Sequence, residues 1–214
     1  MRSRLRTGQP TAVAVMVVIL VAAILPGCSA GSSSSSQPSS AAPTSAGASG
    51  FDGAALPAVA PVSNFTLADQ EGRSVSLAAY HGQVTIVAFL YSTCGPACIV
   101  IAEQIRGALD ELRRVVPVLL ISADPSADTP AHARRFLTEV SLTGRVHYLG
   151  GSLAQLRPIW RSFRIVPATA GRAAFDRSAS VFLLDRTGRQ RVLFQPEELT
   201  PETLAHDIRK LWSD

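Results

Sequence analysis

The chain has 214 residues, enough for one domain with accessory segments, and 47% of them are hydrophobic. It carries 20 lysines and arginines against 16 aspartates and glutamates, but three of the arginines lie within the first six residues. Without those three the balance is 17 to 16, so the sequence offers no electrostatic case for binding nucleic acid.

The N-terminal stretch has the three parts of a secretory signal peptide. The arginines are followed by an uncharged apolar run at 12–25 and then by Pro26-Gly27-Cys28. The run is shorter than the roughly 20 residues that a membrane-spanning helix needs, which favours a signal peptide at 1–27 over a transmembrane anchor. The Leu-Pro-Gly-Cys stretch resembles the lipobox of bacterial lipoproteins. This resemblance implies that Cys28 is acylated and holds the protein on the extracytoplasmic face of the cell membrane.

Residues 28–60 are predicted to form a flexible tether. They are mostly serine, alanine, glycine and proline with almost no charge. Such a composition cannot build a packed core. The folded domain is therefore expected at 61–214.

Short strands and amphipathic helices alternate through the rest of the chain. Strands are expected near residues 65–67, 74–76, 84–90, 116–122, 146–149, 181–184 and 190–194, and helices after Cys98, at 130–140, at 153–163 and from 201. Before the second helix, loop and capping roles are expected for Asp124, Asp128 and Thr129. This order predicts an α/β fold with a central mixed sheet flanked by helices.

Cys94 and Cys98 lie where an apolar strand is followed directly by a helix. With Pro96 in the first turn, the unpaired N–H groups and the helix dipole favour a thiolate at Cys94. Residues four apart on a helix are within the Cα separation that a disulfide tolerates. The pair can close, open or bind a soft metal. A purely structural staple is the weaker interpretation, because so short a loop constrains the unfolded chain little.

A dithiol at the carboxyl end of a central strand matches the thioredoxin fold, and the surrounding motifs resemble one branch of it, the SCO/SenC family. The shared positions are Phe65-x-Leu67, Gly72, Gly82, Phe89, Thr93-Cys94-x-Pro96-x-Cys98, Ser122-x-Asp124-Pro125, Asp128-Thr129-Pro130, Leu142-Thr143-Gly144 and Asp176-x-Ser178. The resemblance implies a membrane-tethered copper or redox protein that helps to mature the binuclear copper centre of cytochrome c oxidase. It also implies copper ligation by the two cysteines and by a histidine just before a late strand.

Arg177 stands where the family has that histidine. Arginine stays protonated and has no lone pair to offer a metal. If it faces the dithiol, it repels a cation and stabilises thiolates instead. A second departure is Ile99, where the family usually has proline. Surface or core roles are expected for the four histidines, of which His147 is the least implausible replacement ligand: His81, His132, His147 and His206.

Two functions remain open. In the first, Cys94 and Cys98 are the catalytic pair of a thiol–disulfide exchange protein, Arg177 tunes their thiolates and no cofactor is required. Its partner would be a cytochrome c oxidase subunit or another extracytoplasmic thiol protein. In the second, the same two cysteines bind copper as the metal ligands of a metallochaperone. A peroxidase is disfavoured because Tyr91 occupies the place of the threonine in the Thr-x-x-Cys pattern of peroxiredoxins.

Overall fold

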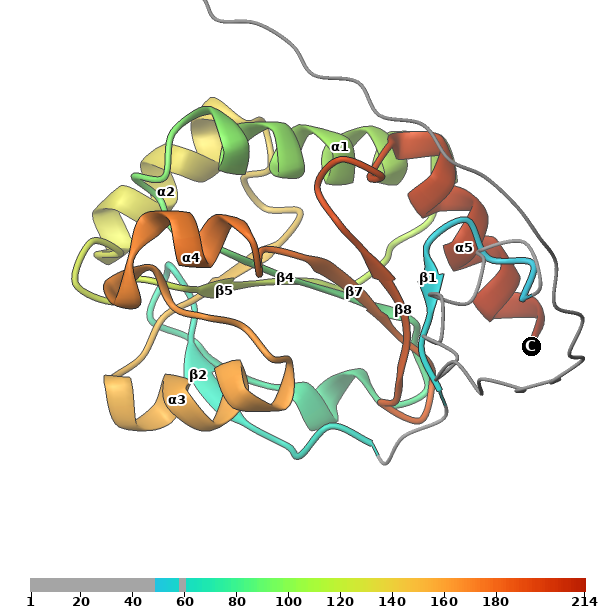
Figure 1. The fold of residues 1–214 in the computed structure, drawn as a ribbon, viewed down its shortest axis with the longest axis horizontal. Helices are drawn as coiled ribbons and strands as arrows, with labels where there is room; N and C mark the ends of the chain where they lie inside the picture. The colour runs from blue at the N-terminus through green and yellow to red at the C-terminus, as the bar shows by residue number, and fades with distance from the viewer. Residues whose placement is uncertain (1–48, 58–60) are drawn as a thin grey trace, which may run out of the picture. The chain divides into compact units, whose positions relative to one another are not determined.

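A six-stranded sheet forms the centre of the molecule, in a computed structural model that describes residues 49–57 and 61–214 (Figure 1). The expected signal peptide and Cys28 lie outside the described residues. The strand order is β1-β8-β7-β4-β5-β6, with a separate hairpin of β2 and β3. The strands are β1 Ala54–Ala55, β2 Thr66–Ala68, β3 Ser74–Ser76, β4 Thr85–Leu90, β5 Val118–Ser122, β6 His147–Leu149, β7 Val181–Leu184 and β8 Gln190–Phe194.

Half of the main sheet is parallel. β4 and β5 run parallel, with Phe89 opposite Ile121, and β6 runs parallel to β5. β7 is antiparallel to β4, and β8 and β1 continue the antiparallel half. The carboxyl ends of β4, β5 and β6 therefore meet at one edge of the sheet, where loops can bring their side chains together. This mixed sheet confirms the predicted α/β architecture.

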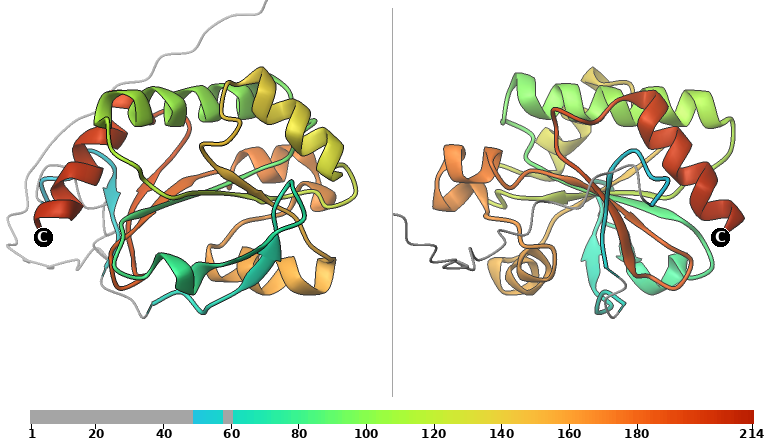
Figure 2. Two further views of the ribbon diagram at one scale, coloured as in Figure 1. Left: turned by 180° about the vertical axis from the view of Figure 1, so that it is seen from behind. Right: turned by 45° about the vertical axis from the view of Figure 1, so that its right-hand side comes forward.

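Helices cover both faces of the sheet. α1 and α5 pack against each other on one face, and α3 lies on the other with the β2–β3 hairpin (Figures 1 and 2). The helices are α1 Pro96–Leu112, α2 Pro130–Glu139, α3 Leu153–Ser162, α4 Arg172–Asp176 and α5 Pro201–Ser213, with 3₁₀ turns at Leu77–Tyr80 and Ala168–Ala170. Within the described ranges, no helix combines the length and apolarity needed to cross a membrane.

The apolar patterns in the sequence correspond to the buried surfaces. Every residue of β4, β5 and β7 is buried, as expected for strands that are covered on both faces. α1 buries the face that its spacing predicted, including Ile101, Ile105 and Leu109. Helical spacing and continuous apolar runs were therefore sufficient to locate these elements.

The N-terminal boundary of the folded domain differs from the prediction. Residues 49–57 belong to the expected tether, yet β1 pairs with β8 and Phe51 is buried. The buried carboxylate of Asp207 accepts hydrogen bonds from the backbone N–H groups of Asp52 (2.8 Å) and Gly53 (2.9 Å). A side chain at Gly53 would come within 2.6 Å of Val192, so the close approach requires glycine. The prediction of a structureless segment is wrong for this part.

Candidate functional site

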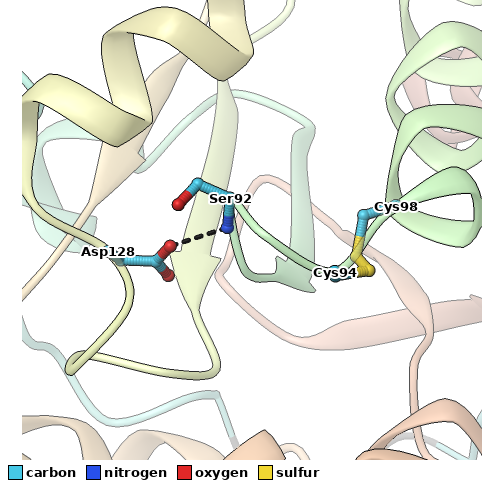
Figure 3. Close-up of a disulfide and its surroundings, with 4 residues drawn as sticks. All are labelled: Ser92, Cys94, Cys98 and Asp128. Atoms are coloured by element: carbon cyan, nitrogen blue, oxygen red, sulfur yellow. Dashed lines mark hydrogen bonds between the residues drawn. A yellow bond between two sulfur atoms is a disulfide. The ribbon is translucent and has the colours of Figure 1, made fainter.

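The cysteine pair lies in the loop that joins β4 to α1. Gly95 precedes the helix with φ 83°, a conformation that favours glycine, and Pro96 is the first helical residue. Cys94 and Cys98 form a disulfide with a Cα–Cα separation of 5.9 Å (Figure 3). The predicted ability of the pair to close is confirmed, and the disulfide is located at the carboxyl end of β4.

Both cysteines are buried in this oxidised state. Cys98 is 1% exposed, and Cys94 is 8% exposed. The Cys94 backbone N–H donates to the Tyr91 carbonyl (3.0 Å), which forms a tight turn after β4. The disulfide form is therefore largely shielded from solvent. Of the two sulfur-bearing residues, Cys94 is the more accessible to another molecule.

Asp128 connects the cysteine loop to the loop after β5. Its carboxylate accepts from the Ser92 N–H (2.6 Å) and from the Ser122 hydroxyl (2.5 Å), as Figure 3 shows for Ser92. Thr129 is the helix cap and accepts from the His132 N–H. The capping role predicted for Thr129 is thus confirmed. Asp128 instead fixes the backbone two residues before Cys94, which sequence spacing alone gave no means of finding.

The Asp128 carboxyl has an environment that disfavours its charge. Burial raises its pKa above the ordinary value, although its hydrogen bonds act in the opposite direction. Burial, together with the nearby Asp128 charge, also raises the pKa of Tyr148. Within the described residues, the hydroxyls of Ser92 and Tyr148 are buried without a hydrogen-bond partner. A buried polar cluster thus lies behind the cysteine loop.

Two arginines lie at the two ends of α4, Arg172 and Arg177. Arg177 ends α4, is exposed, and lines a cavity of about 550 Å³ with Phe182 and Gln190. Among the described residues no contact joins it to either cysteine, so its tuning of the thiolates stays a prediction. Arg172, unlike Arg177, contacts the loop before the cysteines, since its guanidinium is 5.9 Å from the centre of the Tyr91 ring.

Two of the histidines already have hydrogen-bond partners other than the cysteines. His147 begins β6, at the amino ends of the parallel strands, and its Nδ1 lies 3.1 Å from Asp69 Oδ2. It is therefore no substitute for the ligand that Arg177 replaces. His132 Nδ1 lies 2.8 Å from the Ala127 carbonyl oxygen. The surface or satisfied roles expected for these two histidines are confirmed.

One further cluster of candidate metal ligands is present in the described part of the chain. It consists of Asp52, His206 and Asp207, and it contains no cysteine. His206 Nδ1 lies 2.9 Å from Asp207 and 3.1 Å from Asp52. Because Asp207 also accepts two backbone N–H groups, this cluster has a structural role in holding β1 against α5.

The donors at the cysteine pair suit copper only in part. After reduction, Cys94 and Cys98 would offer two soft sulfur ligands at adjacent positions. In the described ranges no histidine contacts either of them. Two thiolates alone can hold Cu(I), but the imidazole that would complete the site is missing.

The sequence matches the SCO1/SenC family over residues 54–213. It is 24% identical over 140 residues to the SCO2-like protein RP587 of Rickettsia prowazekii, covering 58% of this chain and 64% of that protein. It is also 29% identical over 145 residues to the chloroplastic peroxiredoxin Q of Suaeda salsa, covering 65% and 62%. The chain thus spans less than two thirds of the length of these curated relatives.

Solved structures share the fold. The apo form of Sco1 from Thermus thermophilus aligns with a TM-score of 0.61 at 20% identity, covering 75% of this chain and 96% of that one. The copper-bound ScoI of Bradyrhizobium japonicum aligns with a TM-score of 0.54 at 28% identity, covering 71% and 99%. The fold is accordingly the thioredoxin-like one that the sequence predicted. Since the family match extends from β1 to the end of α5, the chain belongs to the SCO1/SenC family.

Proposed function

We propose that this protein carries out dithiol–disulfide exchange through Cys94 and Cys98. It would reduce the cysteines of an extracytoplasmic partner during assembly of the copper centre of cytochrome c oxidase, held at the membrane by a lipid on Cys28. The observation that carries the proposal is the Cys94–Cys98 disulfide at the start of α1. Family membership supplies the context of oxidase assembly.

The exchange needs no cofactor. The Cys94 thiolate attacks one sulfur of the partner disulfide, whose second sulfur leaves as a thiolate. The Cys98 thiolate then attacks the Cys94 sulfur, closes the disulfide described above and releases the partner's first sulfur. Two electrons pass to the partner, and the two protons given up by the cysteines protonate its thiolates. Cys94 is assigned the first attack because it is the more accessible of the two.

The test is a redox titration of the full chain in thiol–disulfide buffers, followed by exchange with a peptide that contains one disulfide. The Cys98→Ser variant should accumulate the mixed disulfide, because the resolving thiol is missing. The Cys94→Ser variant should not react. A Cys94→Ser variant that exchanges as fast as the wild type would contradict the proposal.

Copper delivery is the second candidate. It is favoured by the copper-bound ScoI that aligns at 28% identity and by the adjacent pair of sulfurs. It is weakened by Arg177, which cannot donate a lone pair. Copper would here be a cargo held by two thiolates. An anaerobic Cu(I) titration of the reduced chain against a competing chelator, with Cys98→Ser as control, separates the two functions. Tight one-to-one binding that the control loses would favour delivery, whereas weak binding with intact exchange would favour thiol reduction.

A further inference from the structure

Charge is distributed unevenly over the folded domain. Between residues 153 and 178 there are five arginines and one aspartate, a net charge of +4. The rest of residues 49–214 carries 12 basic and 15 acidic residues, a net charge of −3. A domain with a total charge close to zero therefore has one strongly positive region. We call its five exposed side chains the arginine face: Arg157, Arg161, Arg164, Arg172 and Arg177.

The arginine face is not neutralised within the domain. In the part of the chain that the structure describes, none of its five members forms an ion pair, and Arg172 contacts the Tyr91 ring. By contrast, five of the eleven other described arginines pair with carboxylates: Arg73, Arg106, Arg145, Arg191 and Arg209. Guanidinium groups without a partner keep their charge and their hydrogen-bond donors available for another molecule.

Contacts between the segments after α3 and α4 hold two members of the face together. Arg164 and Arg177 line the same cavity. The Ser178 hydroxyl accepts from the Val166 N–H (2.9 Å), which ties the loop after α3 to the loop after α4. Arg157 and Arg161 extend the face along α3 at a spacing of four residues, where side chains share one side of a helix.

One end of the arginine face lies beside the loop that carries the disulfide. The Arg172 guanidinium is 5.9 Å from the centre of the Tyr91 ring, and the Tyr91 carbonyl accepts from the Cys94 N–H. From α4, Phe175 packs edge-on against Tyr91 at 5.3 Å between ring centres. The Ala168 N–H donates to the Ala123 carbonyl (3.0 Å), and the Ala123 N–H donates to Leu90 at the end of β4 (2.8 Å), so the segment before α4 is also joined to the carboxyl end of β4.

One exposed valine lies in the segment of the arginine face, and another lies on α1 close in sequence to the disulfide. Val100 is 45% exposed two residues after Cys98, and Val166 is 37% exposed in the loop between Arg164 and Arg172. Protein interfaces combine a small apolar centre with a charged rim, and complementary charge accelerates association. An apolar contact beside a reactive disulfide suits a protein partner better than a lipid surface, which would cover the sulfurs.

We infer that the arginine face receives the acidic surface of the thiol partner, that is, a protein with aspartates and glutamates beside its reacting cysteines. This inference rests on the proposed function and names the chemistry of its partner. The positive region steers the partner toward Cys94, and the valines contact it once it is bound. The rest of the domain has a net negative charge and repels an acidic partner, so the partner approaches with its acidic surface toward the arginine face.

The test compares two synthetic peptides that differ only in four flanking residues, all glutamate in one and all lysine in the other. Each is prepared with a disulfide and also in a redox-inert form with serines in place of cysteines. At low ionic strength, where the Debye length is about 30 Å, the inert glutamate peptide should bind the full chain at least about tenfold more tightly than the lysine peptide. This preference should disappear in roughly 1 M salt. The disulfide forms should react in the same order.

Matched charge reversals locate the effect. R161E/R164E removes two members of the face that contact neither the cysteines nor Tyr91, and the preference should fall severalfold. R113E/R189E makes the same change in charge at exposed sites outside the face and should keep the preference. Equal binding of the two inert peptides would overturn the inference. So would an equal loss in both double variants, or binding to anionic phosphatidylglycerol vesicles that depends on Arg161 and Arg164 without a peptide preference.

The inert peptides also distinguish a failure of the arginine face from a failure of thiol exchange. If the inert glutamate peptide binds selectively but neither disulfide peptide reacts, the role of the arginine face is supported and the proposed thiol exchange is contradicted. If both disulfide peptides react equally and neither inert form is preferred, the proposed thiol exchange is supported and the inference of an acidic partner is contradicted.

Discussion

Two aspartates that line one pocket beside the edge strand β6 have opposite electrostatics. Asp69 lies beside the start of β6, and its carboxylate accepts from the guanidinium of Arg73 and lies 3.1 Å from His147 Nδ1. Burial opposes its ionisation, but these hydrogen bonds and those from the backbone prevail and lower its pKa. At the carboxyl ends, Asp128 has only neutral donors among its hydrogen bonds, and burial raises its pKa. Two differences account for the opposite directions: the Asp128 carboxyl is more deeply desolvated, and only Asp69 has a cation among its hydrogen-bond partners.

The difference corresponds to the roles of the two carboxylates. Asp69 closes the turn between β2 and β3 by accepting from the backbone N–H groups of Glu71 and Arg73, both at 2.9 Å. Asp128 instead holds Ser92, in the loop that carries the disulfide. The structural turn therefore has the carboxylate with more hydrogen bonds, and the loop next to the cysteines is held by fewer.

The largest effect is expected for Asp69→Ala. The change removes the acceptor of two backbone N–H groups and of the Arg73 side chain, so the free energy of unfolding should fall by about 3 kcal/mol. Urea denaturation measures the loss. Asp124→Ala, which opens a half-buried turn of similar design, should cost about 1 kcal/mol. Equal losses in the two variants would show that burial of Asp69 adds nothing.

Arg177→His would place an imidazole just before β7, whereas among the described residues no histidine contacts either cysteine. The Cu(I) dissociation constant should fall by about 100-fold, or about 2.8 kcal/mol, because a third ligand joins the two thiolates. Removal of the positive charge should also raise the pKa of Cys94. Competition with a chelator gives the affinity, and the pH dependence of alkylation gives the pKa. Arg172→His is the matched control, and a similar gain in that variant would contradict the assignment of position 177.

Asp128→Ala should cost about 2 kcal/mol, less than Asp69→Ala, since it removes one backbone and one hydroxyl contact. Release of Ser92 loosens the loop before Cys94, so the disulfide should also be reduced faster by a neutral dithiol. Stopped-flow reduction measures this rate. Asp128→Asn keeps an acceptor, so its rate of disulfide reduction should lie between those of the wild type and the alanine variant. An unchanged rate in Asp128→Ala would mean that the clamp does not act on the disulfide.

The range of the interactions explains what sequence could predict. The cysteine site, the cap at Thr129 and the buried strands depend on neighbours a few residues away, and all of them were predicted. The contact between Asp128 and Ser92 joins residues 36 apart, and that between Asp207 and Asp52 joins residues 155 apart. A two-residue strand of alanines has no periodicity of its own, so β1 is defined only by β8 and by Asp207. Long-range pairing of short or polar segments is what the sequence pattern could not reveal.

The smallest effect is the opposite dependence of the two aspartates on pH. The lowered pKa of Asp69 gives a stabilisation that is complete above its ordinary value of 3.8 and is lost as the pH falls through the folded-state value. The raised pKa of Asp128 gives a stabilisation that is complete below 3.8 and is lost as the pH rises through the folded-state value. Denaturation of the wild type, Asp69→Asn and Asp128→Asn between about pH 3 and 6 should therefore give difference curves that slope in opposite directions, each by about 1 kcal/mol or less. Parallel curves would show that the surroundings of the two carboxylates do not determine their charge, and the contrast between Asp69 and Asp128 would fail.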